Sequence, residues 1–151
     1  WEFFIAGGDP KNPAHRARYG DSKATPADTG WIAAPDNVAF DPKGRIWIAT
    51  DGQDDWAGFA DSVYAAETSG PRRGITKCFF SGPRGSEICG PTFTPDGKYL
   101  VAAGEDKVIR VWDVETGRTV RTIRGQAVPG ADGTIYGAET GGRDVKMYRK
   151  K

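Results

Sequence analysis

Histidine and cysteine are scarce in this sequence, and each scarcity excludes a class of protein. The 151 residues include one histidine, His15, and two cysteines, Cys78 and Cys89. A single histidine in a polar segment gives no indication of a Ser-His-Asp triad. Two cysteines are too few for the disulfide framework of a small secreted scaffold. We interpret both as buried free thiols, the usual state of cysteine in a core.

Net charge and long apolar runs are also limited. The 21 Lys and Arg residues nearly balance the 20 Asp and Glu residues, which leaves a formal net charge of +1. No global electrostatic field therefore favours nucleic acid or an anionic membrane surface. No apolar run approaches the ~20 residues that a membrane-spanning helix needs. We predict a protein with no nucleic-acid partner and no membrane partner.

Glycine and proline, by contrast, are plentiful and lie between short runs of strand-forming residues. The sequence has 21 glycines and 10 prolines, and no stretch of ~10 residues shows helical periodicity. Many short strands separated by Gly/Pro turns are typical of an all-β sandwich, barrel or propeller. The length suffices for a substantial core. The sequence thus predicts an all-β fold in one domain over residues 1–151.

One turn-strand unit occurs three times, and this repeat decides between the all-β architectures. Gly44, Gly97 and Gly133 hold equivalent turn positions, and each is followed by a short apolar strand. Their spacing is near the ~40 residues of a propeller blade, with a longer loop in the first unit. A sandwich does not need such a repeat. We therefore predict three four-stranded blades, half of a six-bladed β-propeller, at residues 36–81, 87–124 and 125–149.

The third blade runs out of strands after Tyr148, and the N-terminus offers a spare strand. We expect residues 1–6, WEFFIA, to close the blade at 125–149. This closure would cover two sheet edges that otherwise invite aggregation. Three blades are too few for a ring, because propellers typically have four to eight. Two chains about a two-fold axis would supply six, so we predict a homodimer.

The segment around Trp112 resembles a known repeat family. Residues 106–113, DKVIRVWD, resemble the end of a WD40 repeat, with Trp112-Asp113 as the signature dipeptide, and the resemblance extends over residues 92–125. The family's Gly-His pair is expected near Gly125-Gln126, where this sequence has no histidine. We therefore expect the hydrogen-bond network that stabilises many WD40 blades to be incomplete here.

Two further resemblances cover the rest of the chain. Residues 1–100 resemble the C-terminal part of the PhoX-type alkaline phosphatases, six-bladed propellers that use bound calcium and iron on phosphoester substrates. The matching runs are WEFF and GDP within 1–10, PDNVAFDP at 35–42, GRIWIATDG at 44–52, GPRGSE at 82–87 and GPTFTPDG at 90–97. Residues 126–149, with DGTIY and AETG, resemble an NHL or strictosidine-synthase-like blade. Blades that resemble three families indicate a chimera, either engineered or recombined in nature.

Candidate ligands for a metal ion lie where the inner strands of the blades begin. In a propeller these positions point into the central channel, and here Asp36, Asn37 and Glu87 offer hard oxygen ligands that suit calcium. The PhoX resemblance implies that Glu87 reaches that family's metal centre, but such a site needs several metal ions, which three side chains do not hold. The alternative is a polar, water-filled channel without a bound ion. We expect no cofactor, with calcium as the one candidate.

A second acidic segment lies at residues 51–61 and contains Asp51, Asp54, Asp55 and Asp61. Its spacing does not match the D-x-D-x-D-G pattern of a calcium-binding loop. A calcium site and a solvated acidic loop are both conceivable here, and the spacing favours the loop.

Three functions remain open at this point. The first is a self-assembling scaffold assembled from blades of different families, without catalytic activity. The second is a fragment of a PhoX-type phosphatase, a metal-dependent phosphoric monoester hydrolase. The third is a WD40-like module that binds other proteins. The change of family in the last third of the chain favours the scaffold.

Overall fold

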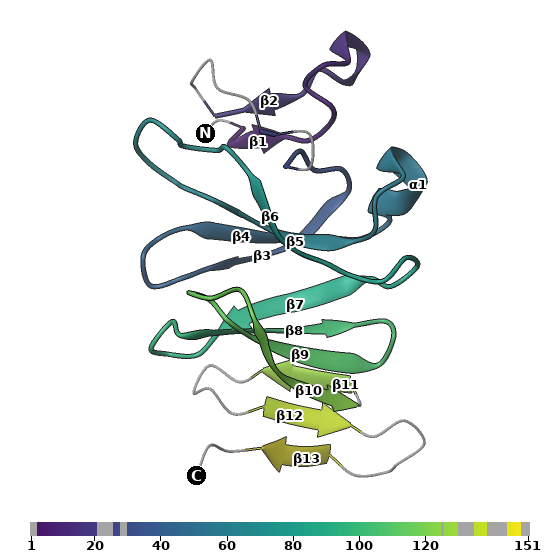
Figure 1. Cartoon of the computed structure of the whole chain (residues 1–151), viewed down its shortest axis with the longest axis vertical. Coiled ribbons are helices and arrows are strands. Elements are labelled where there is room, and N and C mark those ends of the chain that lie inside the picture. Colours follow the sequence, from purple (N-terminus) through teal and green to yellow (C-terminus); the bar gives the residue numbers. More distant parts are fainter. Residues whose placement is uncertain are drawn as a thin grey trace.

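The computed structural model of this chain describes residues 3–20, 26–27 and 30–124, and also the backbone of three strands within residues 126–148. Its main sheets are three antiparallel meanders that follow one another in a row (Figure 1). The first contains β3 (Pro35–Phe40), β4 (Ile46–Thr50), β5 (Ser62–Ala66) and β6 (Lys77–Ser81). The second contains β7 (Ile88–Phe93), β8 (Tyr99–Gly104), β9 (Val108–Asp113) and β10 (Thr119–Arg124). The third contains β11 (Gln126–Pro129), β12 (Ile135–Ala138) and β13 (Val145–Tyr148), so the all-β prediction of three blade-like sheets is confirmed.

The repeated turn of the sequence has a simple backbone explanation. Gly44 and Gly97 have φ angles of 79° and 66°, in the left-handed region that favours glycine. Their N–H groups donate to the carbonyl oxygens of Asp41 and Thr94, which closes a tight turn in each sheet. The turn around Gly97 also packs against Pro42 so closely that an added Cβ would lie 2.7 Å from the proline ring. The third turn glycine, Gly133, lies outside the described residues.

The faces of the first and second sheets pack against each other and form the main core. Its buried members are Trp47, Ala49, Val63, Ile88, Leu100, Ala102 and Trp112. Trp47 of β4 meets Phe79 and Phe93 edge-on, with ring centroids 4.9 and 5.2 Å apart. Because Phe93 belongs to β7, this aromatic group joins the two sheets. Each large side chain buried here contributes about 1.5–3 kcal/mol to folding.

The N-terminal segment covers the opposite face of the first sheet. β1 (Ile5–Ala6) pairs with β2 (Arg18–Tyr19), and the 3-10 helix η1 (Pro13–His15) lies between them. Tyr19 is buried in a second core cluster with Ile48 and Tyr64 of the first sheet. Its hydroxyl donates to the carbonyl oxygen of Gly8 and accepts from the N–H of Ile32, both at 2.9 Å. The phenol therefore fixes two stretches of the segment on the sheet.

The sequence predicts that residues 1–6 close the third sheet, and within one chain this prediction is wrong. β1 pairs with β2 instead. β1 and the third sheet lie at opposite ends of the row, with the first and second sheets between them (Figure 1). Trp1 and Glu2 lie outside the described residues. Closure by a strand from a second copy stays a prediction.

The segment after β4 is helical, although the sequence predicts a loop there. α1 (Gln53–Ala57) lies between Gly52 and Gly58, which have φ angles of 81° and 71°. The N–H of Gly58 donates to the carbonyl oxygen of Asp54 and ends the helix. A helix of one and a half turns is too short to show periodicity. Neither α1 nor any other helix in the described ranges has the length and apolar character needed to cross a bilayer.

The two cysteines are free, as predicted, but their burial differs from the prediction. Cys78 is exposed and Cys89 is partly buried. Cys78 lies on β6, the outermost strand of the first sheet, where one side of the strand has no neighbour in that sheet. The prediction of a buried thiol is therefore wrong for Cys78.

Trp47 and Trp112 are both buried, but only the first has a partner for its indole N–H. The Nε1 of Trp47 donates to Oδ2 of Asp41 at 3.1 Å. Asp41 also accepts from the backbone N–H and the guanidinium of Arg45. Burial opposes ionisation of Asp41, but these hydrogen bonds outweigh it and hold the pKa of the carboxyl below its ordinary value.

The indole N–H of Trp112 has no hydrogen-bond partner in the structure, although the side chain is 1% exposed. This orphaned donor agrees with the expectation of an incomplete WD40 network. A buried N–H without a partner loses its hydrogen bonds to water without compensation. Trp112 therefore stabilises the core through packing alone.

Comparison of Trp47→Phe with Trp112→Phe will measure this difference. Both variants remove part of a buried indole, but only Trp47→Phe removes a hydrogen bond, the one from the indole N–H to Asp41. We expect Trp47→Phe to lower the free energy of unfolding by about 1–3 kcal/mol more than Trp112→Phe does. Chemical denaturation of both variants gives the two values. Equal losses would show that the Asp41 contact adds nothing to stability.

Candidate functional site

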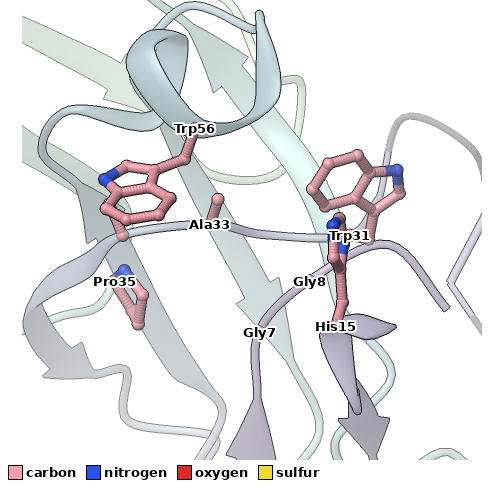
Figure 2. Close-up of a pocket in the computed structure, with 8 residues that line it drawn as sticks. Gly7, Gly8, His15, Trp31, Ala33, Pro35 and Trp56 are labelled. Atoms are coloured by element: carbon pink, nitrogen blue, oxygen red, sulfur yellow. The ribbon is translucent and has the colours of Figure 1, made fainter. Parts of the chain in front are cut away.

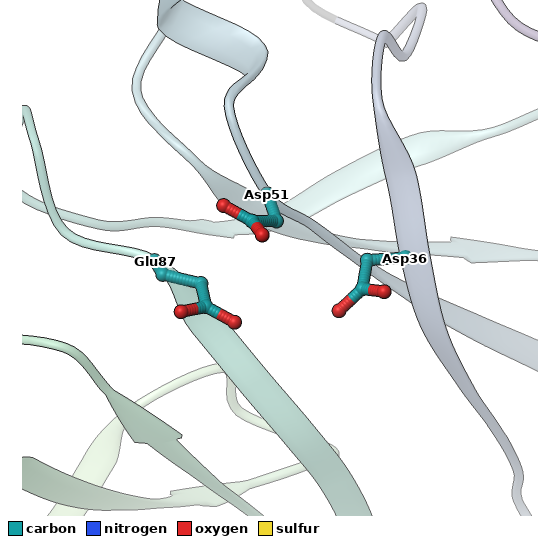
Figure 3. A group of neighbouring side chains, drawn as sticks. All are labelled: Asp36, Asp51 and Glu87. Carbon is teal, nitrogen blue, oxygen red and sulfur yellow. The ribbon is translucent and has the colours of Figure 1, made fainter.

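Three carboxylates from different segments converge at one end of the first two sheets. Asp36 lies at the start of β3, Asp51 directly follows β4, and Glu87 directly precedes β7. One carboxylate oxygen from each lies within 4.8 Å of the others (Figure 3). The pairing of β3 with β4 brings Asp36 and Asp51 together, because β3 begins beside the end of β4, where Pro35 faces Thr50. β3 and β4 also pack against β7. We call Asp36, Asp51 and Glu87 the carboxylate cluster.

The structure brings together two of the three residues that the sequence predicts for a cation site. Asp36 and Glu87 belong to the carboxylate cluster, but Asn37 does not. Its Oδ1 accepts from the N–H of Gly90 at 3.0 Å and so links the first sheet to the second. The register of β3 shifts between Pro35 and Val38, and this irregular stretch contains both Asp36 and Asn37. The assignment of these residues to metal binding stays a prediction.

Asp51 is the cluster member that the sequence reasoning missed. The sequence indicates an acidic loop around it, because Asp54, Asp55 and Asp61 follow within ten residues. The useful signal was its place directly after the second strand of the blade. In an antiparallel hairpin, the end of the second strand lies beside the start of the first, and there Asp36 stands.

The remaining acidic residues of that segment do not join the cluster. Asp54 and Asp55 lie on α1. Asp61 is only 4% exposed, so the prediction of a solvated loop is wrong for this residue. Its carboxylate accepts from the N–H groups of Gly52 and Gln53 and from the Thr50 hydroxyl, at 2.8–3.0 Å. Asp61 therefore holds the start of α1 in place.

The three carboxylates of the cluster repel one another when no cation is present. Burial, and then the negative charges of Asp51 and Asp36, raise the pKa of Glu87 above its ordinary value. Burial and the same three carboxylates also raise the pKa of the Cys89 thiol. The cluster thus creates a local negative field that a cation would relieve.

The donor set fits one hard divalent cation and does not fit a multi-metal centre. Three carboxylates offer oxygen ligands of the kind that calcium prefers, with water completing its six to eight positions. A centre that both holds phosphate and generates a nucleophile needs several metal ions and more ligands than these. The cluster is therefore a candidate calcium site, whose three protein ligands come from two sheets.

A comparison with protein-family models assigns the chain to a family. The family model for alkaline phosphatase PhoX matches residues 1–104, about two thirds of the chain and all three members of the carboxylate cluster. The chain belongs to the PhoX family. The match ends at the last residue of β8, inside the second sheet.

Curated relatives of another kind match shorter stretches of the chain. A ribosome biogenesis protein BOP1 homolog from Drosophila persimilis is 38% identical over 56 residues, 32% of this chain. The general transcriptional corepressor TUP1 of Saccharomyces cerevisiae is 46% identical over 33 residues, 22% of this chain. The chain spans only 7% and 5% of the lengths of these two proteins.

A solved structure of low sequence identity supports the fold independently. A chain in the crystal structure of a mitotic checkpoint complex superposes with a TM-score of 0.50 at 14% sequence identity. The match covers 80% of this chain and 35% of that one. Together with the WD40-like relatives, it confirms the predicted β-propeller fold. The resemblance of residues 126–149 to NHL-type blades stays a prediction.

The raised pKa of Glu87 predicts how stability depends on pH. At pH values between the unfolded and folded pKa of Glu87, the folded chain binds more protons than the unfolded chain does. The free energy of unfolding therefore falls as the pH rises through this range. Glu87→Gln removes this contribution, so we expect the stability of the variant relative to the wild type to increase as the pH rises. Denaturant unfolding in the presence of a chelator, at a series of pH values, measures the effect.

Glu115→Gln is the matched control, because Glu115 lies in the turn after β9, at the other end of the second sheet. This control should not gain stability over the same pH range. A Glu87→Gln profile parallel to that of the wild type would contradict the repulsion within the cluster.

Proposed function

We propose that this chain is half of a six-bladed β-propeller that closes with a second copy of itself, and that the ring is a scaffold without catalytic activity of its own. One observation carries the proposal. The three sheets stand in an open row, with β1 at one end and β13 at the other (Figure 1). In a closed propeller each blade packs against two others, and three blades are below the usual number for closure.

The strands at the two ends of the row support a pairing between copies. Within the part of the chain that the structure describes, the third sheet has three strands, whereas the first and second have four each. The two-strand sheet β1–β2 lies on the face of the first sheet where a preceding blade would pack. In the proposed ring, β1 of one copy adds to the third sheet of the other. Two such junctions about a two-fold axis close a ring of six blades.

We further infer that the blades come from different propeller families, by engineering or recombination. The PhoX match stops at the end of β8, while WD40-like relatives match about a third of the chain or less. Blades tolerate such exchange, because each is a local meander that contacts only its neighbours.

The mass in solution tests the assembly. A protein of this sequence should have twice the 16.3 kDa of one chain at micromolar concentration. Multi-angle light scattering measures this mass directly. A well-folded species of 16.3 kDa would refute the proposed ring.

We propose calcium as the ligand of the carboxylate cluster. Three facts support it: the oxygens lie within 4.8 Å of one another, they come from segments fixed by the two sheets, and burial together with the neighbouring carboxylates raises the pKa of Glu87. A bound divalent cation would replace repulsion by attraction and would link the two blades. In a scaffold, this ion has a structural role.

Calcium titration tests this site. We expect Asp36→Asn and Asp51→Asn each to weaken calcium binding by about tenfold or more, because each removes one of three anionic ligands. Isothermal titration calorimetry gives the dissociation constants. Asp55→Asn, on the exposed side of α1, is the matched control and should bind as the wild type does. Equal weakening in all three variants, or no binding to the wild type, would overturn the calcium proposal.

Membership of the PhoX family supports a second candidate, a metal-dependent phosphatase. In that case Glu87 would contribute to a metal centre that acts on phosphoesters, with further ligands from elsewhere. Hydrolysis of an aryl phosphate in the presence of added calcium and iron separates the candidates. We expect no turnover from the scaffold, whereas turnover that disappears in Glu87→Gln would favour the phosphatase.

A further inference from the structure

An aromatic cleft lies between the N-terminal segment and the first sheet, apart from the carboxylate cluster. Trp56 lies above Pro35 on one side, Trp31 lies above His15 on the other, and Ala33 lies between the two pairs (Figure 2). The cavity has a volume of about 350 Å³, the size of a small-molecule site, and its walls are mostly apolar. We call it the tryptophan cleft.

The Trp31 ring and the helix that carries Trp56 are both anchored at the surface. Trp56 is 81% exposed, yet it stands on α1, which is anchored by the fully buried Gln53. The amide of Gln53 accepts from the N–H of Ala33 at 3.1 Å and donates to the hydroxyl of Tyr64 at 3.0 Å. Trp31 packs against Phe59, with ring centroids 4.9 Å apart. Trp31 and the backbone of α1 are therefore pre-formed parts of the cleft, which lowers the entropic cost of binding.

Several polar groups along the cleft already have partners within the chain. They are the N–H and carbonyl oxygen of Gly8, the N–H of Ala33, the carbonyl oxygen of Ala34 and the Nδ1 of His15. A ligand with many hydrogen-bonding groups would lose its hydrogen bonds to water here and would form few with the protein. The cleft therefore favours a ligand that needs few hydrogen bonds.

The segments that line the cleft carry more carboxylates than basic groups. Among the residues within two positions of its lining, Asp9, Asp36, Asp54 and Asp55 carry carboxylates and Arg16 carries a positive charge. The guanidinium of Arg84 adds a second positive charge where it donates to the carbonyl oxygen of Gly58. Indole faces attract cations through their quadrupole, and tryptophan does so best among the aromatic side chains. Aromatic walls, a negative rim and few available hydrogen-bond partners together describe the environment of an alkylated ammonium ion.

We propose that the tryptophan cleft binds the quaternary ammonium group of a free small molecule, held between Trp31 and Trp56. Such a group has no N–H to satisfy, unlike a primary ammonium with its three donors. Its positive charge distinguishes it from a neutral apolar group of the same shape. The proposal requires neither calcium nor the second copy, so it stands or fails separately from the proposed scaffold.

Three related probes test this site in the full chain by calorimetry, with indole N–H shifts in NMR as a second measurement. We expect choline to bind at least about tenfold more tightly than ethanolamine, which carries a primary ammonium, and than dimethylbutanol, the neutral carbon isostere of choline. Equal binding of dimethylbutanol would overturn the proposal in favour of a purely apolar cleft. No binding of choline would overturn it as well.

A fourth probe and two variants complete the test. Phosphocholine, which represents a lipid headgroup, should bind more weakly than choline, because its phosphate is repelled by the carboxylates around the cleft. Stronger binding would contradict a free small molecule as the ligand.

Trp56→Leu should weaken choline binding by about tenfold or more, since leucine keeps apolar bulk but has no π face. Phe40→Leu is the matched control, because Phe40 is also exposed and ends β3 away from the cleft. Unchanged binding in Trp56→Leu would overturn the proposal.

Discussion

The packing of the first sheet on the second is the contact on which the rest of the structure depends. A four-stranded meander has two faces and cannot bury both alone, so each sheet is stable only against a neighbour. Trp47 provides the centre of this contact, with Phe79 of its own sheet and Phe93 of the next one around it. Trp112 fills the same core from β9. The aromatic rings set how closely and at what angle the sheets approach.

Both candidate sites follow from that packing and from a few buried polar anchors. The sheets bring the start of β7 next to the start of β3, and so place Glu87 beside Asp36. Asp61 and Gln53 fix the segment after β4, which carries Asp51 into the carboxylate cluster and Trp56 into the tryptophan cleft. These anchors are buried and fully engaged, whereas the groups that they present face solvent. Rigid support beneath exposed charge and exposed aromatic rings is how a propeller presents binding groups.

Much of the fold was predictable because its signals are local. The turns at Gly44 and Gly97 require a backbone that glycine adopts readily, so their recurrence identified the blades. The missing histidine predicted an incomplete hydrogen-bond network, and the indole N–H of Trp112 has no partner in the described part of the chain. The place of β1 was not predictable in this way, because it depends on Tyr19, whose hydroxyl joins Gly8 to Ile32 across the segment. A sequence shows a tyrosine in a polar stretch but not which distant backbone groups it will meet.

The sequence alone determined the all-β class, the number of blade-like sheets, and the position of Asp36 and Glu87 where strands begin. These follow from turn chemistry and strand alternation, which act over a few residues. Only the tertiary structure shows that Asp51, and not Asn37, belongs to the carboxylate cluster. It also pairs β1 with β2 and places Trp31 and Trp56 in the lining of one cleft. Each of those depends on register and sheet packing between segments distant in the chain. Such long-range choices are decided by burial and hydrogen bonding of the whole molecule, which no local pattern encodes.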